Sequence, residues 1–324
     1  MAGSRFRRGL VVSGLLGALL VTGGQTGAAI AETPSVASGA AGQPLEILPS
    51  GHPVVAISID GSVPRRFVID TAASVTTIMP KLRSGMPGLV IKESAAPLDG
   101  AAGKAFVETA VVGALHVAGQ VFRSPELLLL PPGPTDRLGV DGILGADIIA
   151  DFAVEMDMPG RRWRMTPKVE AGMLDGLSAP IPFVLDRQRA PRLTISVNGV
   201  EMPAVLDTGA RGTILNWAGA RAIGLTPDSP GLAKVSDIRG ATNHATASVE
   251  ARLTALMIGD VKVEAPKVRI ADQSEFKVLG FQPDQPAVIL GIDMFADRRF
   301  VIDHPGLRLH ISPPAVSRAA ASQS

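Results

Sequence analysis

The chain repeats itself once along its length, and this internal repeat constrains the fold more than any single motif. Each copy contains an Asp-Thr pair after an apolar segment and ends with an apolar-Leu-Gly segment. The two Asp-Thr pairs are Asp70-Thr71 and Asp207-Thr208, and the closing glycines are Gly145 and Gly291. The Asp-Thr pairs are offset by 207 − 70 = 137 residues and the glycines by 291 − 145 = 146 residues. The copies differ by a few loop residues, and we predict two similar lobes.

The length and composition agree with two lobes built mainly from strands. A chain of 324 residues exceeds the usual size of one hydrophobic core. Hydrophobic residues make up 46% and charged residues 19%, with 35 Gly and 26 Pro, which is typical of a globular chain rich in turns. We place the first lobe at residues 45–166, a linker at 167–182 and the second lobe at 183–312.

The local patterns within each copy predict the same elements. The dipeptides Asp60-Gly61 and Asn198-Gly199 follow alternating strands, and they favour tight hairpin turns. The apolar runs 127–130 and 268–270 are predicted to be buried strands. One short helix is expected after each apolar-Leu-Gly segment, with Asp147 and Asp293 as its capping residues. Asp157 and Asp303 lie in Pro-Gly turns, where we expect them to bind their own backbone.

The first 31 residues have the pattern of a secretory signal peptide. Three arginines precede an apolar run over residues 10–21, and small residues follow up to Glu32. The run is shorter than the roughly 20 residues of a transmembrane helix. We predict a signal peptide over 1–31 and export, with an uncleaved anchor as the alternative. A flexible leader over 32–44 and a disordered tail over 313–324 are expected because small and polar residues dominate both segments.

Several classes of function are excluded by what the sequence lacks. The formal net charge is +1, and without Arg5, Arg7 and Arg8 it is 1 − 3 = −2, so no basic surface for nucleic acid is expected. The absence of cysteine excludes disulfides and thiol catalysis. The five histidines have no zinc-binding spacing, so no metal site is expected. Neither a serine-hydrolase elbow nor a phosphate-binding loop occurs.

The residues around the two Asp-Thr pairs resemble the signature of retropepsin-like aspartic peptidases. The first copy has Ile69-Asp70-Thr71-Ala72-Ala73-Ser74-Val75-Thr76 and Ile143-Leu144-Gly145, and the second has Leu206-Asp207-Thr208-Gly209-Ala210-Arg211-Gly212-Thr213 and Ile289-Leu290-Gly291. The arrangement is similar to bacterial periplasmic members of that family, in which two lobes of one chain replace a homodimer. The resemblance implies a mainly β fold with two pseudo-symmetric closed-barrel lobes, and a periplasmic location.

The resemblance also implies the chemistry. Asp70 and Asp207 would share one proton, activate a water and hydrolyse peptide bonds in an extended peptide, with no cofactor. Thr71 and Thr208 would cross-link the two active-site loops, and the backbone amides at Ala72 and Gly209 would hold the carboxylates coplanar. Two glycine-bearing segments, 99–103 and 238–241, are candidate flaps over the substrate, or ordinary surface turns. The partner would be a peptide or protein substrate, and the chain a monomer whose lobes pair in cis.

Two departures from the pattern leave other hypotheses open. Ala72 replaces the glycine of the motif in the first lobe, where it adds a methyl group and restricts φ. Arg211 places a cation in the second loop, where it would lower the pKa of Asp207 if it lay close. The first alternative is a catalytically inactive lobe pair that binds extended peptides. The second is a site formed in trans between lobes of two molecules.

Overall fold

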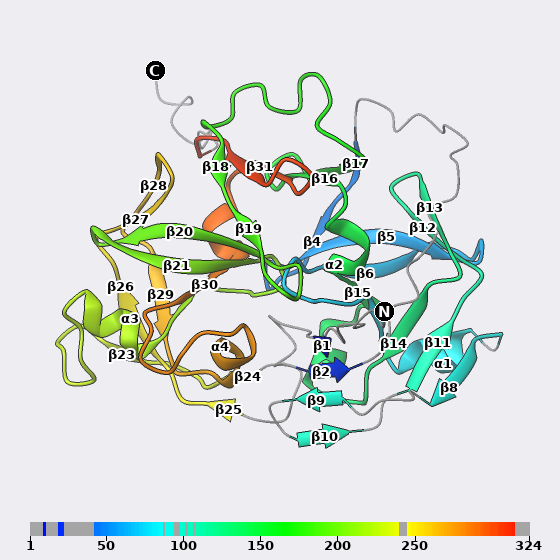
Figure 1. The fold of residues 1–324 in the computed structure, drawn as a ribbon, viewed down its shortest axis with the longest axis horizontal. Helices are drawn as coiled ribbons and strands as arrows, with labels where there is room; N and C mark the ends of the chain where they lie inside the picture. The colour runs from blue at the N-terminus through cyan, green and yellow to red at the C-terminus, as the bar shows by residue number, and fades with distance from the viewer. Residues whose placement is uncertain are drawn as a thin grey trace, which may run out of the picture.

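The structure of this chain is a computed structural model that describes residues 9–10, 19–22, 42–86, 88–93, 98–100, 103–105, 108–239 and 245–314. It is mainly β, with two lobes side by side and a further sheet that connects them (Figure 1). The structure therefore confirms the predicted fold class.

The first lobe is a curled sheet of ten strands. These are β4 (Glu46–Ile47), β5 (Pro53–Ile59), β6 (Arg65–Ile69), β7 (Thr77–Ile78), β8 (Val90–Glu93), β11 (Glu108–Val111), β12 (Ala114–Val117), β13 (Gln120–Arg123), β14 (Glu126–Leu129) and β15 (Gly142–Leu144). Their order in the sheet is β13-β12-β5-β6-β15-β7-β14-β11-β8, and β4 pairs with β5. Strand β15 lies between β6 and β7 and runs parallel to β6. The strand that leads to Asp70 and the strand that ends at the closing glycine are therefore neighbours in the middle of the sheet.

The second lobe repeats this arrangement strand for strand. Its strands are β19 (Val184–Leu185), β20 (Pro191–Val197), β21 (Val200–Asp207), β22 (Ile214–Leu215), β23 (Ala233–Lys234), β26 (Val249–Arg252), β27 (Ala255–Ile258), β28 (Val261–Glu264), β29 (Lys267–Ile270) and β30 (Val288–Gly291). Their order is β28-β27-β20-β21-β30-β22-β29-β26-β23, and β19 pairs with β20. The internal repeat of the sequence is thus a repeat of sheet topology.

A third sheet joins the lobes. It consists of β3 (Gln43–Pro44), β16 (Ala153–Asp157), β17 (Arg162–Thr166), β18 (Ile181–Pro182), β31 (Arg299–Asp303) and β32 (Arg308–Ile311). Strands β16 and β31 pair antiparallel, and Glu155 is opposite Val301. These two residues are offset by 301 − 155 = 146, the same offset as the closing glycines. Equivalent residues therefore face each other, which places the local two-fold axis between them.

The remaining elements are short. The helices are α1 (Lys81–Gly85), η1 (Pro134–Leu138), α2 (Ala146–Ile149), α3 (Trp217–Ala222), α4 (Ser274–Val278) and η2 (Ile292–Phe295). Strands β1 (Gly9–Leu10), β2 (Leu19–Thr22), β9 (Leu98–Gly100) and β10 (Gly103–Ala105) form a four-stranded sheet, and β24 (Ile238–Arg239) pairs with β25 (Ala245–Thr246). Within the described residues, every helix is too short or too polar to cross a membrane.

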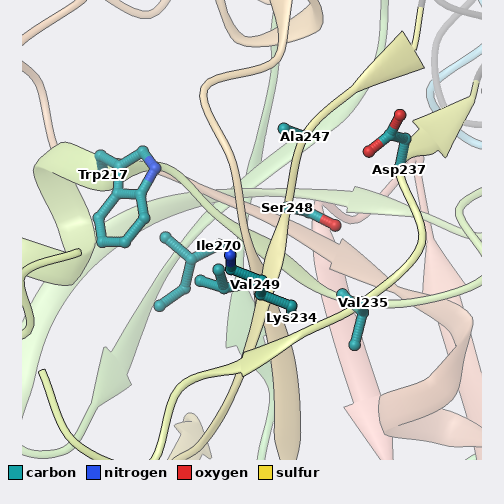
Figure 2. A pocket seen from close by; sticks show the side chains of 8 residues that line it. All are labelled: Trp217, Lys234, Val235, Asp237, Ala247, Ser248, Val249 and Ile270. Atoms are coloured by element: carbon teal, nitrogen blue, oxygen red, sulfur yellow. The ribbon is translucent and has the colours of Figure 1, made fainter. Parts of the chain in front are cut away.

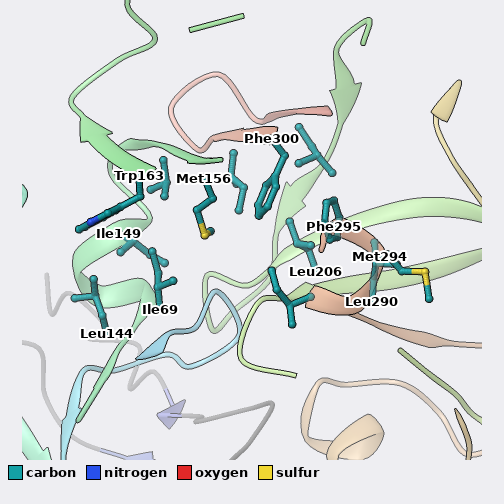
Figure 3. Close-up of a cluster of buried hydrophobic side chains, with 14 of the residues drawn as sticks. Ile69, Leu144, Ile149, Met156, Trp163, Leu206, Leu290, Met294, Phe295 and Phe300 are labelled. Atoms are coloured by element: carbon teal, nitrogen blue, oxygen red, sulfur yellow. The ribbon is translucent and has the colours of Figure 1, made fainter. Parts of the chain in front are cut away.

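One large hydrophobic core extends through both lobes. Ile69 and Leu206, which precede the two Asp-Thr pairs, belong to the same buried cluster as Met156 and Phe300 of the joining sheet (Figure 3). Alternation along the strands explains which side chains enter it: in β5, Ile57 is buried while its neighbour Ala56 is exposed. The two loops that follow Ile69 and Leu206 thus rest on one continuous core.

The predicted turns, strands and turn aspartates are confirmed. Asp60 and Asn198 have φ of 49° each, and the glycine after each also has positive φ, as these tight turns require. The predicted buried strands correspond to β14 and β29 within one residue. Asp157 accepts a hydrogen bond of 2.9 Å from the Gly160 N–H, and the Asp303 turn repeats it at 3.0 Å from Gly306.

The predicted leader and linker take part in the joining sheet. Residues 43–44 form β3 and pair with β17, so the end of the predicted leader is part of the joining sheet. In the linker, Met173 is fully buried in a cluster with Ala153 and Val301, and β18 pairs with β32. Apart from β1 and β2, the predicted signal peptide lies outside the described residues, as do residues 32–41 of the leader and residues 315–324 of the tail.

Candidate active site

The two candidate aspartates stand at equivalent places in the middle of each lobe. Asp70 follows β6 and Asp207 ends β21, and each of these strands runs parallel to the closing strand of its repeat. The Asp70 N–H donates to the Leu144 carbonyl at 3.0 Å. Both aspartate side chains are fully buried. In both repeats, therefore, the carboxyl lies at the end of a central strand of the sheet.

Each carboxyl is oriented by two backbone amides of its own loop. Oδ1 of Asp70 accepts from the N–H groups of Ala72 and Ala73, each at 2.9 Å. Oδ1 of Asp207 accepts from Gly209 and Ala210, also at 2.9 Å each. Among the described residues, Oδ2 of either carboxyl has no hydrogen-bond partner. One oxygen of each pair is thus fixed by the protein, while the other is left to react.

The two loops are tied together by a symmetric set of threonine hydrogen bonds. Thr71 Oγ1 donates to the Leu206 carbonyl at 2.7 Å and accepts from the Thr208 N–H at 3.1 Å. Thr208 Oγ1 donates to the Ile69 carbonyl at 2.8 Å and accepts from the Thr71 N–H at 3.1 Å. All these groups are buried. Each threonine therefore satisfies buried backbone groups of the opposite lobe and holds the two aspartates in register.

Thr71→Val and Thr208→Val should each lower the free energy of unfolding by about 1–3 kcal/mol, because a buried N–H and a buried carbonyl each lose their partner. Thr77→Val is the matched control. Thr77 is equally buried, but among the described residues its Oγ1 has no partner, so its loss should be neutral or stabilising. Urea unfolding measures all three. If Thr77→Val lowered the free energy of unfolding equally, the effect would come from packing and not from the hydrogen bonds.

Burial dominates the electrostatics of the aspartate pair. Burial raises the pKa of Asp70, the charge of Asp207 raises it further, and the amides of Ala72 and Ala73 act in the opposite direction. Burial also raises the pKa of Asp207, against the amides of Ala210 and Gly209 and the neighbouring Asp70 side chain. A desolvated carboxyl favours its neutral form. The pair therefore retains a proton well above the pH at which an exposed aspartate ionises.

Asp147 and Asp293 do not cap helices, and the prediction that they do is wrong. The residues at the two helix N-caps are Gly145 and Gly291. Asp147 Oδ1 instead accepts from Thr76 Oγ1 at 2.7 Å, and Asp293 Oδ1 accepts from Thr213 Oγ1 at 2.8 Å. A carboxylate one residue into the helix points back at the loop, where a threonine hydroxyl competes successfully for it. These aspartates support the loops that hold the candidate pair.

The closing glycines are required by the same contacts. Thr76 Oγ1 accepts from the Gly145 N–H at 3.1 Å, and Thr213 Oγ1 accepts from Gly291 at 3.0 Å. A Cβ at Gly145 would lie 2.6 Å from the backbone of Val75, and one at Gly291 would lie 2.6 Å from the backbone of Gly212. Only glycine lets the closing strand approach the aspartate loop this closely.

Ala72 fits the first loop without backbone strain. Neither Ala72 nor Gly209 has positive φ, so the expected restriction of φ by alanine has no effect here. The Ala72 side chain is fully buried in a cluster whose other members all come from the second lobe. Gly209 differs, because a Cβ there would lie 2.2 Å from Asp70 Oδ2. The two loops thus make the same hydrogen bonds to their aspartates, but only the first has room for a side chain at this position.

Arg211 does not act on the aspartate beside it in sequence. Its charge lowers the pKa of His52, which is a buried residue of the first lobe. The Asp207 pKa shift comes from burial and from the groups named above. Arg211 is exposed and is not among the groups that shift the pKa of Asp207, so the condition attached to that prediction, that Arg211 lies close to Asp207, is not met.

The arms of both candidate flaps are paired strands. Gly100 is opposite Gly103 in the β9–β10 pair, and Arg239 is opposite Ala245 in the β24–β25 pair. Residues 101–102 and 240–244, which include the tips, lie outside the described residues. Hairpins thus occur at equivalent places of the two repeats.

A hollow of about 320 Å³ lies in the second lobe beside the β24–β25 hairpin. It is lined by Trp217, Lys234, Val235, Asp237, Ala247, Ser248, Val249 and Ile270. Figure 2 shows Trp217 and Asp237 on opposite sides of it. None of the predicted site residues lines this hollow, so it is distinct from the aspartate pair. In the described part of the chain, no cluster of three or more His, Asp or Glu side chains could hold a metal ion.

Two buried polar side chains near the aspartates were not predicted. His52 precedes β5, and Glu275 lies on α4, where its charge contributes to the raised pKa of Asp70. For His52 a signal exists in the sequence. The hairpin around Asp60-Gly61 pairs the strand that follows His52 with the strand that leads to Asp70, so the two residues are expected at the same end of the hairpin. The sequence around Glu275, which forms α4, has no such pattern.

A comparison with known families identifies the one to which this chain is similar. The sequence model of a family described as aspartyl protease matches residues 55–148 and 193–294, once in each lobe and over more than half of the chain. A solved structure that is similar is a retropepsin-like aspartic protease from Rickettsia conorii. It is 19% identical, with 43% of this chain and 98% of that chain covered and a TM-score of 0.33. No curated protein sequence matches this chain.

Proposed function

The chain belongs to the aspartyl protease family, and from this premise we propose that it is an aspartic endopeptidase whose dyad is Asp70 and Asp207. The observation that carries the proposal is the pair of buried carboxyls on loops cross-linked by Thr71 and Thr208. Such a pair shares one proton, because two close carboxylates in a desolvated site do not both ionise. It can therefore act as base and acid in one reaction.

The proposed reaction uses one water and no covalent intermediate. The ionised carboxyl takes a proton from the water as its oxygen attacks the scissile carbonyl carbon, while the protonated carboxyl donates to the oxygen that becomes negative. The C–N bond then breaks, and the nitrogen leaves as an amine after taking a proton from the dyad. The amides of Ala72, Ala73, Gly209 and Ala210 keep Oδ1 of each carboxyl in place through both steps.

We propose an extended peptide as substrate. The β9–β10 and β24–β25 hairpins support this, because a peptide in strand conformation can hydrogen-bond to hairpin backbone. The alternative, a catalytically inactive lobe pair that binds peptides, was based on Ala72. The unstrained backbone of Ala72 and its N–H bond to Asp70 weigh against that alternative. Export to the periplasm, a signal peptide removed near Glu32 and a monomer in cis remain parts of the proposal that rest on the sequence pattern.

Activity should be lost as pH falls below about 7, because burial raises the pKa of Asp207 to about 7 and a dyad with two protons has no base. At high pH the second proton also leaves, and no acid remains. Burial and the charge of Asp207 raise the pKa of Asp70, so this upper limb lies at a still higher pH. A profile of kcat/KM against pH measures both limbs. A lower limb near pH 4, the range of an exposed carboxyl, would contradict the account.

The free energy of unfolding should fall over the same range of pH. A buried aspartate with a raised pKa binds more protons in the native state than in the unfolded state, so folding weakens as pH rises through the native pKa. Asp147 contributes in the same direction, since burial raises its pKa to about 6. Urea midpoints from pH 4 to 8 measure this loss, and an increase in stability across this range would contradict it.

The proposed function is tested by hydrolysis of a mixed peptide library by the purified chain from about pH 3 to 8. Mass spectrometry identifies the cleaved bonds. New termini inside extended peptides are expected. A folded wild-type chain that cleaves nothing at any pH but retains peptides would instead favour the binding protein.

A further inference from the structure

One buried polar side chain near the dyad has no part in the mechanism above. His52 precedes β5 and its side chain is 1% exposed. The antiparallel register of β5 and β6 pairs Val54 with Val68. Continued by two residues along each strand, this register sets His52 opposite Asp70. His52 therefore stands at the active-site end of the first lobe, although it lies 18 residues before Asp70 in the sequence.

The imidazole ring is held by a neighbour in its own turn. Ser50 Oγ lies 2.6 Å from Nδ1 of His52, and Nε2 is buried without a hydrogen-bond partner among the described residues. Burial, followed by the charge of Arg211, lowers the pKa of His52 to about 4, so the ring is neutral around pH 6. A neutral ring that accepts the Ser50 hydroxyl at Nδ1 carries its hydrogen on Nε2.

The Nε2–H of this ring requires an acceptor, because a buried N–H is costly to leave unpaired. The Gly209 main chain raises the pKa of His52, so the Gly209 carbonyl of the second lobe interacts with the ring. The Gly209 carbonyl belongs to the same peptide group as the Ala210 N–H, which donates to Asp207 Oδ1 at 2.9 Å. A hydrogen bond from Nε2 to this carbonyl would therefore connect His52 with the Asp207 carboxyl through a single peptide group, whose two hydrogen bonds would polarise each other.

The equivalent position of the second lobe shows what His52 replaces. In the β20–β21 pair Arg192 is opposite Val205, so two residues further along Ala190 is opposite Asp207. Ala190 is fully buried in the same cluster as Ala72. The loop with the extra methyl group, at Ala72, therefore meets a small residue. The loop without a side chain, at Gly209, meets a large one. The two sides of the pair thus combine Ala72 with Ala190 and Gly209 with His52.

We propose that His52 is a positioning residue for the dyad, and that the Gly209 carbonyl is the acceptor that its buried, unpaired Nε2–H takes up in the working site, which would hold the Gly209–Ala210 peptide group whose N–H orients Asp207. This inference rests on the proposed function. It assigns to the first lobe a contact that fixes the active-site loop of the second, beside the threonine cross-links. Ser50 orients the ring, and the Ala190–Ala72 pair fills the corresponding space on the other side.

The test compares three substitutions of His52 in the full chain. The side-chain nitrogen of Gln can take the place of Nε2, whereas that of Asn reaches only as far as Nδ1, and Ala reaches neither. His52→Asn and His52→Ala should lower kcat about 10- to 100-fold, as expected for a misplaced catalytic group, while KM changes little. His52→Gln should restore kcat to within about threefold of wild type, because it restores the donor.

His304→Ala is the matched control for loss of a buried histidine. His304 is also buried, and its Nδ1 lies 2.9 Å from the Phe152 carbonyl, in the region of the joining sheet. This variant should lower the unfolding midpoint and leave kcat unchanged below that midpoint. If His52→Gln were as impaired as His52→Ala, the ring would act by packing alone and the proposal would be overturned. It would be overturned equally if all three variants kept wild-type kcat.

Hydrogen exchange of the Ala210 amide separates this proposal from the proposed function. Faster exchange is expected in His52→Asn and His52→Ala than in wild type, His52→Gln or His304→Ala. If wild type cleaves no peptide but this pattern appears, the endopeptidase proposal fails and the contact of His52 stands. If wild type cleaves peptides and exchange at Ala210 is the same in every variant, the contact of His52 is refuted.

Discussion

Asp70→Asn and Asp207→Asn should each lower kcat/KM for peptide hydrolysis by about 10⁴-fold, the upper range for loss of an acid–base group. An asparagine keeps an oxygen that can accept the two loop amides, so the loop geometry is retained. It can neither give up nor share a proton, so the pair loses its base and its acid together. The measurement is steady-state hydrolysis of a peptide cleaved by wild type.

Asp157→Asn and Asp303→Asn are the matched controls for these two variants. Each changes a carboxyl that accepts a backbone N–H in a turn of the joining sheet, at equivalent places in the two repeats. Both should keep wild-type kcat/KM. If Asp70→Asn or Asp207→Asn retained a tenth of the activity or more, a shared dyad would be refuted, since neither carboxyl can be spared in the proposed reaction.

Gly209→Ala should lower kcat/KM by about 100-fold, an effect of the size expected from displacing a catalytic group by about an ångström. The new Cβ would lie 2.2 Å from Asp70 Oδ2 and 2.9 Å from its Cβ, so the Asp70 side chain must move. Movement breaks the bonds from Ala72 and Ala73 to Oδ1. Overpacking of this kind should also cost about 1–3 kcal/mol of unfolding free energy.

Gly212→Ala is the matched control in the same loop. A Cβ at Gly212 meets its nearest atom, Asp293 Oδ2, at an ordinary 3.7 Å, and Gly212 does not have positive φ. Its activity should remain close to that of wild type. Ala72→Gly should also keep activity, because only a buried methyl group is lost. If Gly209→Ala were as active as Gly212→Ala, the asymmetry between the two loops would have no catalytic meaning.

Much of the fold could be predicted because each copy of the repeat contains short, local sequence patterns. Asp60-Gly61 and Asn198-Gly199 specify tight turns through their backbone preferences, and the apolar runs that became β14 and β29 have the length of buried strands. A chain-wide repeat adds a second, independent copy of each signal. The pairing of β16 with β31 was not predicted, because it is a contact between copies and depends on where the two-fold axis lies.

The candidate site was predicted less completely, because the sequence does not show where its side chains point or what lies beside them. The backbone around Asp70 and Asp207 follows from the motif, but the direction of a side chain does not. Asp147 has the sequence position of a capping residue, yet Thr76 lies within 2.7 Å of it and binds it instead. Likewise Arg211 is four residues from Asp207 and acts on His52 across the lobe interface.

The role of Ala72 shows the same limit. From the sequence, the motif glycine lets the backbone pass close to the carboxylate, and an alanine in its place indicated an added methyl group and a restricted φ. The structure has no positive φ at either loop position, and the requirement is the free space beside Asp70. That the carboxylate beside Gly209 is the one of the opposite lobe depends on how the lobes pack, so no pattern within one copy could reveal it.

The most direct test of the central claim, that Asp70 and Asp207 of one chain form one dyad, is hydrolysis by an equimolar mixture of Asp70→Asn and Asp207→Asn. Wild type is assayed beside it over a range of concentrations. The account predicts an inactive mixture and a wild-type specific activity that does not depend on concentration. Recovery of activity on mixing would show that aspartates of two chains meet, and it would contradict a dyad formed in cis.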